Sequence, residues 1–458
     1  MSTTRADGTP RIVITGAGWV TPLGSSIHGV WDALVEGKNA IHPVRRFDAS
    51  TYATSFAAEV EEPDLRDYVR EVPPGAERSE HTRFALAAAS MAWKDAGLGD
   101  VAQGQNRPDG FEIPRRRVGV YFGFGEGTPD FESMCASNVT SWESESRSLD
   151  MRRWAESSAR MMTRVGEESQ EPSIALAHLA RVFDVGGPSF NCMTACAAST
   201  QSIGEAFELL RAGRADVMIA GGAHTMIHPL GMTGFIRLTA MSTRNDEPET
   251  APRPFDQTRD GFVMGEGAGV LVLETLEHAM RRGATPLAEI AGYGSSADAF
   301  RITDIQPDGM GAQEAMRDAL DQAGIDPQAR DESGRPLVHY ISAHGTGTKE
   351  NDSIESKAIR GVFGDVAHDV PVSSIKSMMG HLIQAAGAVE CITCVQAIRT
   401  GVLPPTMNLH HPDPVCDLDY VPNASRDVND RGGVRTTLSN SFGFGGQNNT
   451  IVLTRYDT

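Results

Sequence analysis

Short apolar runs alternate with helical patterns along most of the chain. Five runs have the length and composition of strands: 11–16, 117–122, 216–221, 269–274 and 337–343. Strands separated by helices are typical of an α/β architecture with parallel pairing. Because several of these runs are almost wholly apolar, we expect central strands that are covered on both faces.

A helical pattern follows the cysteine at position 196. Ile203, Phe207 and Leu210 recur at helical spacing, and Gly213 supplies a stop signal. Cys196 should therefore lie in the turn between the end of a strand and the start of a helix. The free N–H groups at such a helix start should lower the thiol pKa and hold a developing oxyanion.

Two stretches depart from this alternation. Residues 126–171 are polar and rich in Ser, Met and Arg, with weak helical periodicity around 151–165, which predicts an excursion from the core. Residues 291–311 are rich in Gly and Asp, which predicts a crossover between two halves of the chain.

Composition and charge narrow the classes of partner. In 458 residues the hydrophobic fraction is 40% and the charged fraction 22%, which is typical of compact globular proteins. A formal net charge of -19 argues against nucleic acid as a partner. The longest apolar stretches, 217–223 and 270–273, are too short to span a membrane, and the polar first ten residues predict a cytoplasmic location.

The six cysteines do not have the spacing of a disulfide framework. Cys391 and Cys394 have the spacing of half a zinc site, but they lie in a small-residue helical run, 381–400, without a second pair. We therefore expect buried thiols and no metal.

Cys196 is flanked by side chains small enough for a tight turn, in the sequence Thr-Ala-Cys-Ala-Ala-Ser from 194 to 199. This setting would let a substrate carbonyl approach the sulfur, so Cys196 is a candidate nucleophile. The alternative is one more buried cysteine, as expected for Cys192.

Two histidines stand beside glycines at strand-to-helix loops. His344 precedes Gly345 directly after the run 337–343, and His381 follows Gly380. Open α/β sheets bind ligands at such carboxyl ends of strands. Two neutral imidazoles can each donate an N–H to one oxygen, as the enolate from decarboxylation of a malonyl thioester requires.

Four polar residues near these histidines complete the candidate site. Lys376 could orient or polarise the site around His381, with Glu355 as its counter-ion. The alternative is that both residues are ordinary charged side chains on the surface. Thr346 and Thr348 carry hydroxyls that could bond a polar tether.

With these residues assembled, the chain resembles the β-ketoacyl-[acyl-carrier-protein] synthases, most closely the elongating type II fatty-acid enzyme and the ketosynthases of type II polyketide systems. The motifs that carry the resemblance occur in the expected order at 194–199, 221–223, 242–246, 253–256, 259–263, 344–348, 376–381 and 440–446.

The resemblance implies an α/β, thiolase-like fold, in which two similar βαβ-rich halves, here 10–287 and 288–456, form a five-layered α-β-α-β-α sandwich. It also implies a decarboxylating Claisen condensation of an acyl group with malonyl-acyl-carrier protein, which gives a 3-oxoacyl-carrier protein. The resemblance further implies that the substrates are attached to the phosphopantetheine of acyl carrier protein and that the enzyme itself binds no cofactor. The expected assembly is a homodimer, or a heterodimer with a chain-length-factor-like subunit.

The resemblance also implies residue roles. Cys196 takes the acyl group, while His344 and His381 promote decarboxylation and stabilise the enolate. Lys376 and Glu355 fall on the family's supporting ion pair.

Further roles concern binding. The resemblance implies that Thr346 and Thr348 bond the pantetheine arm. Phe444 matches the gating aromatic whose N–H joins that of Cys196 in the oxyanion hole, and Phe442 is a further substrate-binding residue.

Two departures concern the substrate. Glu126 replaces the apolar residue that lines the family's acyl tunnel, which suggests a short, polar or unsaturated acyl chain. The stretch 141–171 is longer than in the ordinary fatty-acid enzyme, near the region where relatives shape the acyl pocket and dimer contact.

Three alternatives compete with a ketosynthase. A thiolase-type acyl-CoA transferase would need a second cysteine in the C-terminal glycine-rich loop, and 443–447 contains none. A non-catalytic chain-length-factor-like subunit would lack the nucleophile. A papain-like cysteine hydrolase would cleave a simple thioester without malonyl-carrier protein.

Overall fold

The core is a mixed sheet that runs through both halves of the chain. The computed structural model describes residues 2–108, 110–125, 127 and 130–457. Within this part the sheet has ten strands in the order β12-β11-β15-β16-β10-β1-β9-β8-β4-β7. The strands are β1 (Ile12–Val20), β4 (Val118–Phe124), β7 (Ser189–Cys192), β8 (Val217–His224), β9 (Gly267–Thr275), β10 (Ala288–Ala297), β11 (Tyr340–Ser342), β12 (Val372–Ser373), β15 (Thr436–Gly443) and β16 (Gln447–Thr454).

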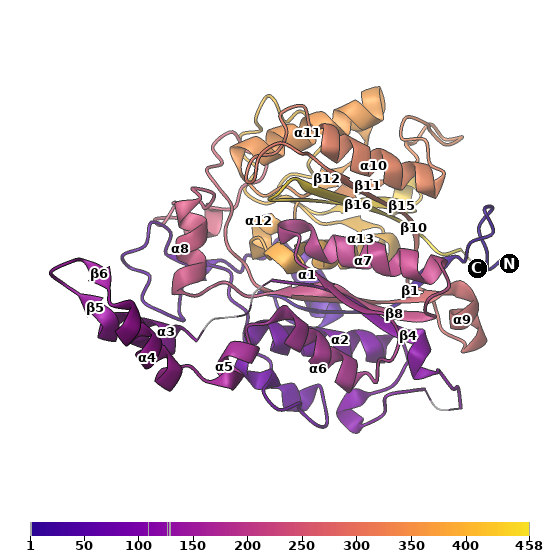
Figure 1. The fold of residues 1–458 in the computed structure, drawn as a ribbon. Helices are drawn as coiled ribbons and strands as arrows, with labels where there is room; N and C mark the ends of the chain where they lie inside the picture. The colour runs from indigo at the N-terminus through magenta and orange to yellow at the C-terminus, as the bar shows by residue number, and fades with distance from the viewer. Residues whose placement is uncertain (1, 109, 126, 128–129, 458) are drawn as a thin grey trace.

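The sheet divides into two halves because β1 and β10 pair at only three positions, Ile12 to Ile14. Helices α7 (Ala198–Arg211) and α13 (Ala386–Thr400) lie between the halves and contact strands of both. Outside them, α10 (Met310–Ala323) and α11 (Lys349–Phe363) form one outer layer, and α2 (Glu80–Asp95) and α6 (Pro172–Val182) form the other (Figure 1). These are the five predicted layers.

Every predicted strand is present, but the predicted parallel pairing is only partly right. Strand β4 pairs in parallel with β7 and β8, whereas β9 runs antiparallel to β8 and β1. The hydrophobic pattern identifies a buried strand but not its direction, since a long connection can return the chain either way. The connection between β8 and β9 contains α8 (Pro229–Arg237).

The predicted crossover at 291–311 is wrong in its first part, which belongs to β10. A Cβ at Gly292 would lie 2.0 Å from the carbonyl oxygen of Ala319, and one at Gly294 equally close to that of Ala315. These glycines let α10 pack closely against the strand, so here they mark a tight contact instead of a loop.

The predicted excursion projects from the body of the molecule (Figure 1). Its described part contains α3 (Phe131–Ser141), β5 (Trp142–Glu143), β6 (Ser148–Leu149), α4 (Met151–Met161) and α5 (Arg164–Glu168). Among the described residues, no helix is both long and apolar enough to cross a bilayer.

Candidate active site

Cys196 lies on a tight turn between a strand and a helix, as the sequence predicted. After β7, a 3₁₀ turn at Ala195–Ala197 leads directly into α7. Ala195 has a φ of +45°, a conformation that costs about 1–3 kcal/mol for a residue with a Cβ. Gly443, at the end of β15, fits against this turn because a Cβ there would lie 2.8 Å from the Thr194 carbonyl oxygen.

The predicted lowering of the thiol pKa is wrong for the free protein. Burial raises the pKa of Cys196 to about 12, although the Lys376 ammonium and the N–H groups of Phe444 and Cys196 act in the opposite direction. Burial destabilises the thiolate by more free energy than the helix start and the Lys376 ammonium stabilise it. The free side chain of Cys196 is therefore a neutral thiol.

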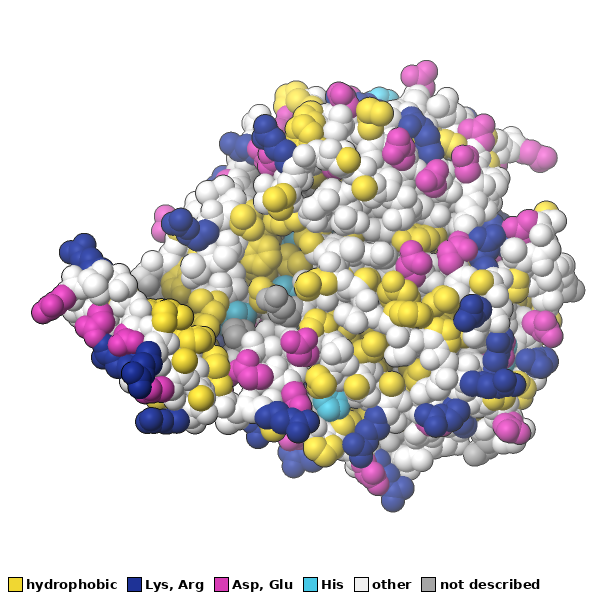
Figure 2. Space-filling view, in the orientation of Figure 1, with side chains coloured by type: hydrophobic (Ala, Val, Ile, Leu, Met, Phe, Trp, Pro, Cys, Tyr) yellow, Lys and Arg dark blue, Asp and Glu magenta, His cyan; other side chains and the backbone are white. Residues whose placement is uncertain are grey.

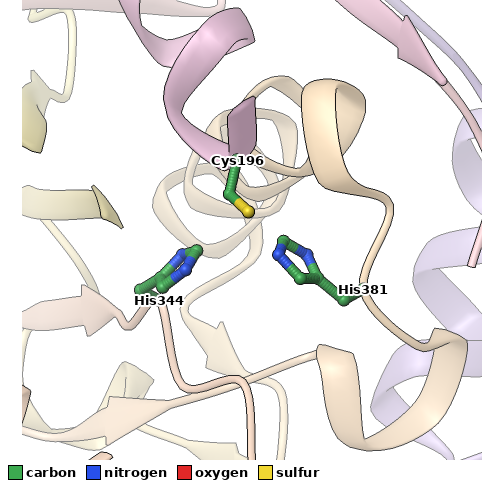
Figure 3. Close-up of side chains that lie close together, drawn as sticks. All are labelled: Cys196, His344 and His381. Carbon is green, nitrogen blue, oxygen red and sulfur yellow. The ribbon is translucent and has the colours of Figure 1, made fainter. Parts of the chain in front are cut away.

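The structure brings the two predicted histidines to this sulfur (Figure 3). His344 follows β11, and His381 follows the short helix α12 (Lys376–Met379) and Gly380. The sulfur of Cys196 and one ring nitrogen of each histidine lie within 4.8 Å of one another. The two ring centroids are 5.3 Å apart, so both imidazoles can reach one bound oxygen.

Both imidazoles are held neutral. Burial, and then the positive charge of Lys376, lowers the pKa of His344 and of His381 well below 6.5. Among the described residues, Nδ1 of His344 and both ring nitrogens of His381 have no hydrogen-bond partner. Each ring can therefore present an N–H to a ligand.

Lys376 forms an ion pair, but not with the predicted carboxylate, Glu355. Lys376 pairs with Glu390, and its ammonium donates to the carbonyl oxygen of His344 at 2.6 Å. Glu355 instead accepts two backbone N–H groups, from His344 and Gly345, each at 2.8 Å. Glu355 thus holds the loop that carries His344, while burial raises its pKa to about 7.

Glu390 is the site residue that the sequence interpretation missed. It is buried on α13 beside the two cysteines that drew attention to that run. The available signal was that Glu390 is the single acidic residue between 381 and 400. Cys391 and Cys394 are buried free thiols, as predicted.

A cavity of about 460 Å³ opens over the cysteine and the two histidines. Four other predicted residues line it: Thr346, Thr348, Phe442 and Phe444. The two threonine hydroxyls are 3.1 Å apart. Figure 2 shows the hollow, with hydrophobic side chains around it and histidine inside. Glu126 lies outside the described residues.

The sulfur and two imidazoles are also a donor set that zinc accepts. A divalent cation there would lie near the Lys376 ammonium, which already disfavours the cationic form of both imidazoles. The local charge therefore favours a metal-free site, and its metal content stays a prediction.

The comparisons with known proteins agree with this geometry. Residues 9–279 match the model "Beta-ketoacyl synthase, N-terminal domain", and residues 287–410 match "Beta-ketoacyl synthase, C-terminal domain". The chain belongs to the beta-ketoacyl synthase family. A curated relative, 3-oxoacyl-[acyl-carrier-protein] synthase 2 of Coxiella burnetii, is 41% identical over 446 residues, which are 97% of this chain and 98% of the relative.

Solved ketosynthases share the fold over nearly the whole chain. The ishigamide ketosynthase/chain length factor matches with a TM-score of 0.82 and 31% identity, over 98% of this chain and all of that one. A ketosynthase in complex with its type II PKS acyl-carrier protein matches with a TM-score of 0.81 and 32% identity over the same shares. The predicted family, the thiolase-like fold and the predicted acyltransferase class, a ketosynthase, are thereby confirmed.

Proposed function

We propose that the chain elongates a thioester-bound acyl group by decarboxylating condensation with malonyl-acyl-carrier protein, giving a 3-oxoacyl-carrier protein. The observation that carries this proposal is the convergence of one thiol and two neutral imidazoles in one cavity. The name of the Coxiella burnetii relative supports the same reaction.

In the first half-reaction the Cys196 sulfur attacks the acyl thioester. The bond from the acyl carbon to the carrier's pantetheine sulfur breaks, and the departing thiolate takes the proton of the cysteine. The N–H groups of Cys196 and Phe444, which point at the sulfur, hold the transient oxyanion. Burial keeps the resulting thioester away from water.

In the second half-reaction the malonyl thioester loses CO₂. The electrons of the broken carbon-carbon bond form an enolate, whose oxygen accepts N–H groups from His344 and His381. The enolate carbon then bonds to the acyl carbon on Cys196. The cysteine leaves as thiolate and recovers a proton from solvent.

The remaining residues position these groups. Glu355 fixes the loop of His344, and Lys376 holds that loop through a carbonyl oxygen while Glu390 balances its charge. Thr346 and Thr348 line the cavity beside the histidines, where a pantetheine arm would enter.

The proposed partners are acyl carrier protein and a second copy of the chain, in the cytoplasm. Strand β7 is the last strand of the sheet, and β4 is its single neighbour among the described strands. Phe190 on β7 and Met193 just after it are 50% and 59% exposed. An exposed edge with apolar side chains favours pairing with a second strand.

A two-substrate assay tests the reaction. Wild-type protein should transfer an acyl group to Cys196 and then, with malonyl-carrier protein, release CO₂ and 3-oxoacyl product. Cys196→Ala should form no acyl-enzyme and no condensation product. Full elongation by Cys196→Ala, or hydrolysis of acyl thioesters without any need for malonyl-carrier protein, would contradict the proposal.

A further inference from the structure

The loop after β11 and the first turn of α11 form one wall of the catalytic cavity. Among the residues of this wall that line the cavity are His344, Thr346, Thr348 and Asn351. His344 is 2% exposed and Thr346 7%, whereas Lys349 is an exposed residue. The wall therefore extends from the catalytic imidazole toward the surface of the protein, and Asn351 is part of it.

Hydrogen bonds fix Asn351 beside the two threonines. Its side chain is 4% exposed, and its backbone N–H donates to the hydroxyl oxygen of Thr348 at 3.4 Å. The Thr348 and Thr346 hydroxyl oxygens are 3.1 Å apart. Arg259 holds the same turn, because its guanidinium donates to the carbonyl oxygens of Thr348 at 3.1 Å and of Lys349 at 2.9 Å. Asn351 thus lies next to the two residues expected to bind the carrier arm.

The side-chain amide of Asn351 has one favoured orientation. Its Nδ2 donates to Oδ1 of Asp352 at 3.1 Å. The same carboxylate oxygen accepts the backbone N–H of Gly347 at 3.2 Å. Turning the Asn351 amide over would set two acceptor oxygens against each other. Oδ1 of Asn351 therefore remains as the acceptor, and among the described residues this buried atom has no hydrogen-bond partner.

The cavity wall thus carries an acceptor that lacks a donor. A buried acceptor without a partner is unfavourable, and a ligand N–H would remove that penalty. The empty space is the cavity of about 460 Å³ that Asn351 lines together with Cys196 and both catalytic histidines. In the proposed function the pantetheine arm of the carrier passes through this cavity, and the arm contains two secondary amides, each with one N–H.

We propose that Asn351 accepts an amide N–H of the pantetheine arm and thereby favours thioesters carried on such an arm. This inference rests on the proposed function, because it concerns how the carrier arm is held while its thioester reaches Cys196. Asn351 is a binding residue and takes no part in bond making. Asp352 and Arg259 are positioning residues, since they orient its amide and hold its turn.

Matched thioesters test the contact. One acyl group is attached to pantetheine, to two analogues in which oxygen replaces one or the other amide N–H, and to an analogue without the hydroxyl groups. Acylation of Cys196 is followed by intact-protein mass spectrometry. One of the oxygen analogues should react about tenfold less efficiently than pantetheine, the effect of roughly one good hydrogen bond. Rates within about twofold for both oxygen analogues, or a loss confined to the analogue without hydroxyl groups, would overturn the inference.

Variants assign this discrimination to Asn351. Asn351→Leu has a side chain of similar size without the acceptor, so pantetheine and the sensitive oxygen analogue should react alike. Its Cys196 should be alkylated by iodoacetamide at the wild-type rate, because this reagent lacks the arm. Lys357→Leu, at an exposed position of the same helix, should keep the tenfold ratio. A ratio that persists in Asn351→Leu would overturn the inference.

Should Asn351→Leu fail to fold, the wild-type rates and an experimental structure with a bound pantetheine arm decide the question. Oδ1 of Asn351 is expected within hydrogen-bond distance of an amide nitrogen of the arm, and an arm bound without this contact refutes the inference. Absence of Cys196 acylation by every thioester, including one on carrier protein, would instead overturn the proposed function itself.

Discussion

In the proposed reaction, three side chains and their protonation states govern the chemistry. The sequence predicted that Cys196, His344 and His381 act together, because each was expected in a loop between a strand and a helix. That placement is wrong for His381, which follows helix α12 and Gly380. The prediction of a lowered thiol pKa was also wrong, since burial depends on segments far away in the chain. The sequence marks Glu390 as the single acidic residue between 381 and 400, but its pairing with Lys376 follows only from how α12 and α13 pack.

Alkylation of Cys196 should report its raised pKa. With a pKa of about 12, the thiolate fraction rises about tenfold for each unit of pH between 7 and 10. The rate of labelling by iodoacetamide, followed on the peptide that contains Cys196, should rise with it. A rate that levels off below pH 8 would show that the helix start and Lys376 outweigh burial.

Both histidines should promote decarboxylation, and their effect should not change with pH near 6.5. His344→Ala and His381→Ala each remove one donor to the enolate, so CO₂ release should fall by about 10² to 10³ in each variant. In the wild type, release should show no inflection near pH 6.5, because both rings stay neutral until the pH is well below that value. The check is radiolabelled CO₂ release across pH 5.5 to 8, and undiminished release in both variants would exclude the assigned role.

At the scale of elements, buried contacts fix the positions of the loops that carry Cys196, His344 and His381. Periodicity predicted the strands and α7, but it could not predict that β9 returns antiparallel or that β10 occupies a glycine-rich stretch. Those features follow from how α10 and the long connections pack. The ion pair between α12 and α13, and the fit of β15 against the turn of Cys196, are contacts of the same kind.

Replacing one member of the Lys376–Glu390 pair should destabilise the protein more than replacing both. Lys376→Met or Glu390→Leu alone leaves a buried group without its partner, at a cost of about 3–5 kcal/mol. The double variant should recover most of that loss, since neither charge remains buried. Melting temperatures of the four proteins measure this, and a double variant less stable than both single ones would contradict it.

Gly443 should be intolerant of a side chain. In Gly443→Ala the new Cβ would lie 2.8 Å from the Thr194 carbonyl oxygen and 3.4 Å from the amide of Cys196, so the nucleophile turn must shift. We expect acyl transfer to fall about tenfold or more, since small misplacements of reacting groups carry large rate penalties.

Gly234→Ala is the matched control for Gly443→Ala. A Cβ at this position in α8 would meet nothing within 4 Å. Replacing a helical glycine by alanine adds about 0.5–1 kcal/mol of stability, so acyl transfer should be retained. Equal acyl-transfer rates in the two variants would show that the contact of β15 with the turn is not required.

At the scale of the whole molecule, the two halves share their middle helices, so the site forms where they meet. Cys196 belongs to the first half, whereas His344 and His381 belong to the second. The motifs predicted this arrangement through the family resemblance. They did not predict the shape of the excursion, whose helices α3 and α4 bury serines such as Ser137 and Ser157 against each other and leave Val139 and Met151 exposed. The weak helical periodicity around 151–165 indicates a helix there but not how it packs.

A substitution on the edge strand β7 tests whether two copies of the chain form a dimer through the sheet. If two copies pair through β7, a charge at Phe190 must be buried against the partner, and Phe190→Asp should convert a dimer into a monomer of 49.1 kDa. Val415→Asp is the control, because Val415 is exposed to a similar extent, 52% against 50%, but lies outside the sheet. Sedimentation velocity measures the mass of each. A Phe190→Asp protein that remains dimeric would place the contact on another face, such as the exposed apolar residues of α3 and α4.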